Sequence, residues 1–166
     1  MDAPDTRQTL TVQWTDPSAL AQAARTLSGL DFLRAIRDGR LPQAPIAALL
    51  GMTLAAVEEG HAVFELAPAE QHYNPIGTVH AGVAATMLDS AMACAVHSLQ
   101  PAGGGYTTLE FKVNLVRAVT AQAGTLRAIG RVVHSGSRTA TAEGHLEDAS
   151  GKLYAHASTT CLILRD

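Results

Sequence analysis

Residues 81–99 read AGVAATMLDSAMACAVHSL and are the most informative stretch of the chain. The stretch contains no proline and one early glycine, and Asp89 is its only Asp, Glu, Lys or Arg. A helix over these residues would be apolar on nearly all sides, and such a helix is stable in water only when other elements surround it. The stretch therefore predicts a long central helix that the rest of the fold wraps.

Four candidate strands follow this helix after a glycine-rich loop at residues 101–105. Short turns that contain glycine separate them, which is typical of antiparallel strands joined by hairpins. In the first strand, apolar side chains at odd positions from Thr107 to Leu115 alternate with polar ones, which predicts one buried and one solvated face. The strands expected to form an antiparallel meander are residues 106–119, 125–134, 138–147 and 152–164.

The segment before the helix predicts one more pair of strands. Residues 46–57 are apolar, residues 58–60 favour a turn, and residues 61–66 alternate, so we expect a hairpin. Residues 68–77 are expected to form a loop because prolines and a glycine interrupt them. The fold class that follows is α+β, with an antiparallel sheet of about six strands wrapped around one long central helix.

The first 45 residues have a different pattern. Asp16-Pro17 resembles an N-cap followed by proline at the first helical position, and apolar residues then recur at helical spacing as far as Ile36. Two prolines end this pattern. We therefore expect an N-terminal helical extension over residues 1–45 and a single domain over residues 46–166, a division that suits the length of the chain.

Composition and charge argue against several classes of partner. The formal net charge is −3, so the chain has no global positive field that would attract nucleic acid or an anionic membrane surface. No stretch reaches the ~18 apolar residues of a membrane span, and the N-terminal sequence lacks the apolar region of a signal peptide. We therefore expect a cytoplasmic protein with no nucleic-acid partner and no membrane partner.

The spacing of the residues argues against a metal site and against a serine-hydrolase triad. The seven histidines include no HxH or HxxxH pair, and neither cysteine has a neighbouring ligand at zinc-finger spacing. Cys94 and Cys161 lie in apolar runs, which favours small buried side chains over a disulfide. A G-x-S-x-G elbow is absent from the sequence, so a serine triad lacks its nucleophile. We expect neither a metal nor a bound cofactor.

Asp89 is a lone carboxylate in an otherwise apolar helix. An ionised group is costly there unless another group pairs with it or the site uses it. Asp89 is therefore our candidate for a general base or a nucleophile. The alternative is a structural carboxylate that binds the backbone or an arginine across an interface.

The start of the same helix offers the second half of an acyl-transfer site. Amides at a helix start have no intrahelical partner and the helix dipole is positive there, so those of Ala81 and Gly82 could bind a developing oxyanion. His80 and Asn74 are candidates for positioning the substrate. Their alternatives are packing at the helix entry for His80 and turn formation for Asn74.

The two halves of this site are too far apart to serve one substrate within a single chain. Eight residues separate Ala81 from Asp89, which is about 12 Å along a helix axis. One carbonyl group cannot contact both. If both act on one substrate, the helix start comes from one chain and Asp89 from another, which a two-fold pairing provides. The sequence therefore predicts a dimer.

Residues 77–89, GTVHAGVAATMLD, resemble hotdog-fold acyl-CoA thioesterases of the phenylacetate-degradation type, and the likeness extends over about residues 45–164. The resemblance implies hydrolysis of an acyl-CoA thioester in which the amide at Ala81 polarises the carbonyl group. Asp89 of the partner chain then activates water or attacks directly. A dimer of dimers, that is a homotetramer, is also implied. The family's loop Asn, Gly-x-x-His-Gly-Gly turn and helix Asp correspond to Asn74, Gly77, His80, Ala81, Gly82 and Asp89.

The chain departs from this family at Ala81, where Gly is usual. The methyl group excludes positive φ and narrows the approach to the amide, so we expect altered specificity before lost activity. The resemblance further implies that Thr108, or its neighbour Thr107, positions the attacking water. It also places the hairpin turn with Gly136, Ser137 and Arg138 near the pantetheine and phosphates of CoA.

Three further cations and two rival functions remain open. Lys112, Arg117 and Arg131 could bind the CoA phosphates, since guanidinium groups match phosphate geometry, or they could form ordinary solvated strand faces.

One rival function is that of a hydratase or dehydratase of enoyl or hydroxyacyl thioesters, with His80 as base. The other is a non-catalytic acyl-CoA binding module, which the departure at Ala81 keeps open.

Overall fold

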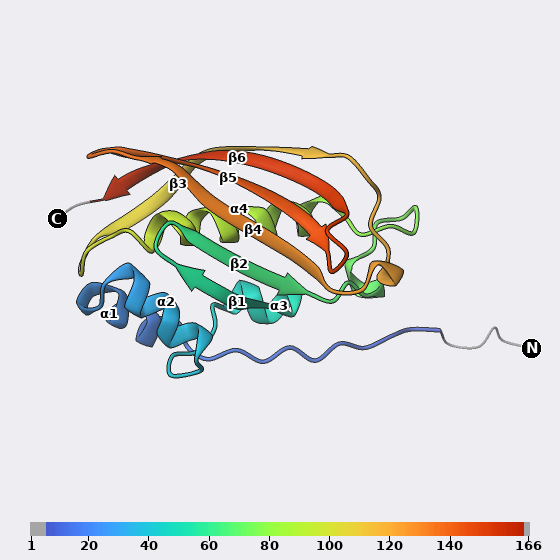
Figure 1. Ribbon diagram of the computed structural model, residues 1–166. Helices are drawn as coiled ribbons and strands as arrows, with labels where there is room; N and C mark the ends of the chain where they lie inside the picture. Colours follow the sequence, from blue (N-terminus) through green and yellow to red (C-terminus); the bar gives the residue numbers. More distant parts are fainter. Residues whose placement is uncertain (1–5, 165–166) are drawn as a thin grey trace, which may run out of the picture.

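The computed structural model describes residues 6–164 and shows a six-stranded antiparallel sheet curled around one long helix (Figure 1). The helix, α4 (Ala81–His97), is the buried centre of the fold. This confirms the predicted fold class. The strands are β1 (Met52–Glu58), β2 (His61–Leu66), β3 (Gly105–Leu115), β4 (Leu126–Ser135), β5 (Thr139–Asp148) and β6 (Leu153–Leu164).

The order of the strands differs from the predicted meander at one strand. The order is β1-β2-β4-β5-β6-β3, so β4, β5 and β6 do form a meander, but β3 pairs with β6 and β4 pairs with β2. The connection from β3 to β4 explains the difference, because residues 116–125 contain a 3-10 turn at Ala121–Ala123 instead of a tight hairpin turn. This longer connection takes the chain across to β2 and leaves β3 at an edge.

Gly130 in β4 lies close against the backbone of α4. A Cβ atom at Gly130 would overlap the backbone of Ala91. We expect Gly130→Ala to lower the free energy of unfolding by about 1–3 kcal/mol, because the strand must move away from the helix. Urea unfolding measures this change. Gly105→Ala is the matched control, since its Cβ would make only an ordinary 3.5 Å contact with Leu164; equal stability of the two variants would contradict the prediction.

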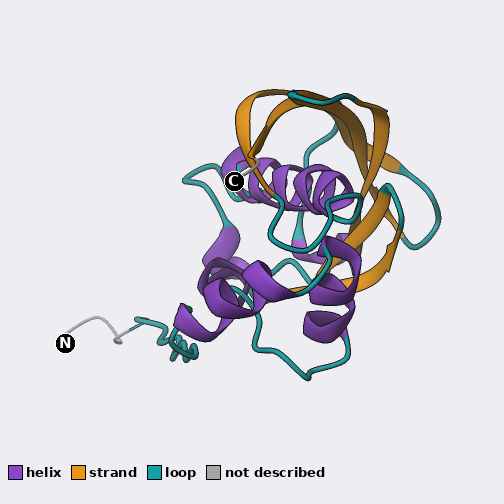
Figure 2. Ribbon diagram, turned by 90° about the vertical axis from the view of Figure 1, so that its left-hand side faces the viewer, coloured by secondary structure: helices purple, strands orange, loops and turns teal. Residues whose placement is uncertain are grey.

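Three shorter helices lie on the side of α4 that the sheet leaves open (Figure 2). They are α1 (Ser18–Thr26), α2 (Gly29–Arg37) and α3 (Pro45–Leu50). The helical pattern that ran from Leu20 to Ile36 is therefore two helices. The break occurs at Ser28, whose hydroxyl oxygen accepts a hydrogen bond from the Asp31 amide at 3.2 Å and so begins α2.

Residues 46–50 are helical, whereas the sequence predicted a strand there. Pro45 stands in the first turn of α3, and Gly51 adopts a left-handed conformation with φ of 69° that ends the helix. The strand of the predicted hairpin begins only at Met52. The division of the chain at residues 45 and 46 stays a prediction. Over residues 6–164, no helix has the length and apolar character that crossing a membrane requires.

Candidate active site

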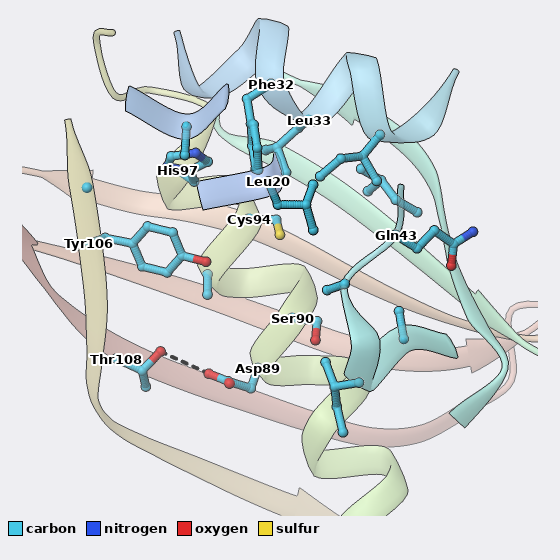
Figure 3. A pocket seen from close by; sticks show the side chains of 18 of the residues that line it. Leu20, Phe32, Leu33, Gln43, Asp89, Ser90, Cys94, His97, Tyr106 and Thr108 are labelled. Atoms are coloured by element: carbon cyan, nitrogen blue, oxygen red, sulfur yellow. Dashed lines mark hydrogen bonds between the residues drawn. The ribbon is translucent and has the colours of Figure 1, made fainter. Parts of the chain in front are cut away.

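Asp89 lies on the face of α4 that meets β3. The Thr108 hydroxyl donates a hydrogen bond to Asp89 Oδ1 at 3.0 Å (Figure 3). Oδ2 has no hydrogen-bond partner among the described residues. Asp89 is half-buried, and no lysine or arginine of the described chain forms a salt bridge with it. The carboxylate is therefore oriented by one neutral donor, and its second oxygen is open to a substrate or a water molecule.

A β-bulge explains why Thr108 faces the helix. The alternation in the sequence predicted that Thr108 lies on the polar face of the strand and Leu109 on the opposite, buried face. Pairing between β3 and β6 shifts register between Thr108 and Glu110, and a bulge of this kind changes which side chains face inward. Tyr106 packs against the core before the bulge and Val113 after it. The prediction that the apolar face is buried is wrong for the single chain, because Leu109 is 57% exposed.

The start of α4 offers one free amide. The Gly82 amide donates to His80 Nδ1 at 2.9 Å, so the histidine ring is the N-cap of the helix. The Val83 amide donates to the His80 carbonyl at 3.0 Å. Within residues 6–164, the Ala81 amide has no acceptor. Of the two predicted oxyanion donors, Ala81 is therefore the one available, and the Gly82 amide is already used.

The same hydrogen bond fixes where His80 holds its proton. Because Nδ1 accepts from the Gly82 amide, a neutral His80 carries its hydrogen on Nε2. His80 is exposed, and its Nε2–H is a second hydrogen-bond donor at the start of α4. This tautomer suits a hydrogen-bond donor to a thioester oxygen and not a base acting through Nδ1.

Asn74 organises the loop before α4. Its Oδ1 accepts hydrogen bonds from the amides of Ile76 and Thr78 at 3.0 and 3.2 Å, and its Nδ2 donates to the Thr78 hydroxyl at 2.9 Å. Gly77 completes the turn with φ of 80°. These contacts agree with the turn-forming alternative for Asn74. Its direct contact with a substrate stays a prediction.

The two predicted half-sites line different cavities within one chain. Asp89 and Thr108 line a cavity of about 630 Å³. Asn74, Ala81 and Arg117 line a second cavity of about 340 Å³, and the two cavities share no lining residue. The α4 helix runs unbroken between Ala81 and Asp89. This agrees with the expectation that both groups reach one substrate only when two chains come together.

The predicted CoA contacts are also divided between the two ends of the sheet. The hairpin with Gly136, Ser137 and Arg138 lies near the start of β3, because the Arg138 carbonyl accepts from the Ile163 amide and Ile163 pairs with Tyr106. Arg117 lies at the other end, where its guanidinium donates to the Leu153 carbonyl at 2.6 Å. One chain therefore does not bring Arg117 and Arg138 together.

Sequence reasoning missed the inner part of the Asp89 cavity. Leu20, Phe32 and Leu33 reach into it from α1 and α2, and Tyr106 and His97 complete its far end (Figure 3). The spacing of Asp89, Ala93 and His97 on one face of α4 was the available signal. The part of the cavity lined by Leu20, Phe32 and Leu33 could not be predicted from the sequence, because it depends on how the N-terminal helices pack against α4.

Cys94 also lines this cavity, and its thiol is not a reactive nucleophile. Burial raises the pKa of Cys94 to about 12, with the negative charge of Asp89 as a smaller cause. The thiolate form is therefore very rare near neutral pH. Cys94 and Cys161 are both free thiols. Packing, which the sequence favoured over catalysis, is the role that this environment supports for Cys94.

Comparisons with known proteins agree with the fold. Residues 76–155 match the model of the Thioesterase superfamily. Over 115 residues the chain is 26% identical to the 1,4-dihydroxy-2-naphthoyl-CoA hydrolase of Listeria monocytogenes, covering 69% of this chain and 91% of that protein. Both matches are to proteins whose names denote the hydrolysis of thioesters.

Two solved structures share the fold. A phenylacetic acid degradation-related protein from Ralstonia eutropha has a TM-score of 0.71 and 28% identity, covering 78% of this chain and 98% of that chain. The Escherichia coli PaaI protein, from the phenylacetic acid degradation operon, has a TM-score of 0.71 and 23% identity, covering 84% and 97%. The phenylacetate-degradation type itself stays a prediction for this chain.

Proposed function

We propose that this hotdog-fold chain, whose residues 76–155 match the Thioesterase superfamily, hydrolyses an acyl-CoA thioester to the free acid and CoA. The observation that carries the proposal is the Asp89–Thr108 pair on the wall of a cavity with a largely apolar lining. The unpartnered Ala81 amide at the start of the same helix supplies the second requirement of acyl transfer, a donor for an oxyanion. The reaction needs no metal and no bound cofactor beyond the CoA of the substrate.

Each group has one role in the proposed reaction. Water attacks the thioester carbonyl carbon while Asp89 takes a proton from it. The carbonyl oxygen becomes an oxyanion, bound by the Ala81 amide of the partner subunit and by Nε2–H of His80 beside it. The intermediate then expels the CoA sulfur by breaking the C–S bond, and the proton on Asp89 passes to the departing thiolate. Thr108 holds Asp89 in place throughout.

Asp89 could instead attack the carbonyl carbon itself and form an acyl anhydride that water hydrolyses. After a single turnover in ¹⁸O-labelled water, label in the Asp89 carboxylate identifies this second route. When water attacks the thioester, the label enters only the released acid. When Asp89 attacks and water then opens the anhydride at the Asp89 carbonyl, the label appears in the Asp89 carboxylate, where mass spectrometry of the peptide detects it.

A second copy of the chain is the expected partner at β3. As the edge strand of the sheet, β3 has one side without a strand partner, and such edges are available for pairing. Leu109, Phe111 and Leu115 are exposed apolar side chains on this strand. Pairing of two β3 strands would cover them and would bring two α4 helices close enough to complete both sites. We therefore include a dimer in the proposed function. Assembly into a dimer of dimers and a cytoplasmic location are also part of the proposal.

Leu109→Asp is expected to convert the dimer to monomers and to abolish most of the hydrolysis, because a charge would enter the paired edge and separate the two half-sites. Analytical ultracentrifugation and thiol release measure the two effects. Val133→Asp is the matched control, since Val133 is 62% exposed on β4, away from this edge. A fully active Leu109→Asp monomer would contradict the requirement for two chains.

Release of free thiol from a panel of acyl-CoA thioesters tests the function itself. Hydration of crotonyl-CoA without thiol release would favour the hydratase alternative, against which the capping role of His80 Nδ1 already counts. Tight binding of acyl-CoA without turnover would indicate a binding module. Turnover of at least one thioester supports the hydrolase.

A further inference from the structure

The Asp89 cavity continues along α4 well beyond the carboxylate. Asp89, Ala93 and His97 all line it, and their spacing of four residues places them on one face of the helix. Eight residues from Asp89 to His97 correspond to about 12 Å along the axis. The cavity is therefore deep as well as large, with the proposed reacting group at one end and His97 at the other (Figure 3).

The outer wall of this cavity belongs to the N-terminal helices. Leu20 of α1 and both Phe32 and Leu33 of α2 point into it. The wall is fixed to the end of α4, because the Gly29 amide donates to the Gln100 carbonyl at 3.0 Å. A Cβ atom at Gly29 would overlap the His97 carbonyl, so the contact requires glycine. Since the family match begins only at residue 76, the wall lies outside the matched residues.

His97 is the unusual group at the far end. The residue is 7% exposed, and its Nδ1 atom is buried without a hydrogen-bond partner. Its ring lies between two aromatic rings, edge-on to Phe32 at 5.5 Å and tilted against Tyr106 at 5.3 Å. Buried polar atoms are nearly always paired in folded proteins, so an unpaired one in a residue that lines a cavity indicates a missing partner. His61 has the other such atom among the described residues, but it does not line this cavity.

The charge of His97 restricts what that partner is. Burial lowers the pKa of His97, so the ring is neutral near pH 7. A neutral imidazole offers one N–H donor and one acceptor nitrogen. Phe32 and Tyr106, whose rings contact His97, carry no charge, and Arg25, the one lysine or arginine among the residues lining the cavity, is an exposed residue. An uncharged hydroxyl or carbonyl group suits this position better than a carboxylate or an ammonium group.

We propose, on the basis of the acyl-CoA hydrolase function above, that this cavity is the acyl subsite and that it selects a bulky, largely apolar acyl group with an uncharged polar substituent at its far end. That substituent hydrogen-bonds to the His97 ring. The volume of about 630 Å³ falls within the common range for small-molecule sites and far exceeds what an acetyl group would fill. The N-terminal helices thereby become the element that sets acyl specificity.

A filled cavity tests the role of the N-terminal wall. Ala24 lines the cavity from α1, whereas Ala21 on the same helix is exposed and does not line it. Ala24→Trp is expected to lower the ratio of kcat/KM for dodecanoyl-CoA over butyryl-CoA at least about 10-fold, because the indole occupies the space of the longer chain. Ala21→Trp is expected to keep the ratio of the unmodified protein. An unchanged ratio in Ala24→Trp would overturn the assignment of the subsite.

Pairs of ω-hydroxyacyl-CoA and unsubstituted acyl-CoA thioesters, from six to twelve carbons, test the role of His97. The unmodified protein is expected to favour the hydroxylated member by roughly 3- to 10-fold in kcat/KM at one chain length, which is the effect of one hydrogen bond. His97→Phe keeps an aromatic ring but removes both nitrogens, so the preference is expected to disappear. His156→Phe, an exposed histidine on β6, is the matched control and is expected to keep it.

The outcomes separate this inference from the proposed function. If the unmodified protein hydrolyses the thioesters but shows no preference at any length, the role of His97 is overturned while the hydrolase stands. The comparison within the unmodified protein decides this even if His97→Phe does not fold. If none of the thioesters in either panel releases thiol, the proposed function fails, and the inference fails with it.

Discussion

Asp89→Asn is expected to lower kcat for acyl-CoA hydrolysis by about 10²- to 10⁴-fold. The amide has nearly the same shape as the carboxylate and can still accept the hydrogen bond that Thr108 donates at 3.0 Å. What it loses is the ability to take a proton from water or to attack a carbonyl group. Steady-state thiol release with the best thioester of the panel measures the loss, and circular dichroism shows whether the fold is kept.

Two other variants show whether this effect is specific to Asp89. Asp38→Asn carries the same chemical change at an exposed position, where the carboxylate pairs with Arg37 and Arg40, and is expected to keep full activity. Thr108→Val leaves the carboxylate charged but removes its orienting donor, so we expect a smaller loss than in Asp89→Asn. If Asp89→Asn and the unmodified protein turn over equally fast, Asp89 is not the base or the nucleophile.

The parts of the fold that could be predicted are those with a strong local pattern. The central helix followed from a stretch with almost no charged residues, and the strand limits followed from turn residues between alternating segments. The position of β3 did not, because strand pairing depends on contacts between segments distant in the sequence. The short helix α3 was missed because an apolar run of this length fits a strand or a helix equally well.

The candidate site divides in the same way. Asp89 and the helix start could be identified from residue type and spacing alone. That Thr108 reaches Asp89 depends on a β-bulge, and that the Gly82 amide is occupied depends on the rotamer of His80. The deep cavity depends on Gly29 docking α2 onto the end of α4. Such features arise from tertiary packing, which the spacing of residues in one sequence does not record.

Ala81→Pro is expected to lower kcat by about 10²- to 10³-fold, because it removes the one free amide at the start of α4. Ala81 is the first residue of the helix, where proline is well tolerated. The preceding residue, His80, has φ of −61° and ψ of 137°, which is compatible with a following proline. Ala81→Gly keeps the N–H and is therefore expected to remain far more active than Ala81→Pro. Equal activity of Ala81→Pro and Ala81→Gly would show that the Ala81 amide does not bind the oxyanion.

Mixing the two inactive variants tests whether each site draws on two chains. In a mixed dimer of Asp89→Asn and Ala81→Pro, one site combines the intact Asp89 of one chain with the intact Ala81 amide of the other, and the second site has neither. Random pairing makes half of the dimers mixed, so co-refolding the two variants is expected to restore about one quarter of the unmodified activity. If each site were built within one chain, every site in the mixture would carry a defect and no activity would return. Recovery in the mixture, set against the inactivity of each variant alone, therefore measures directly that the two ends of α4 act in different chains.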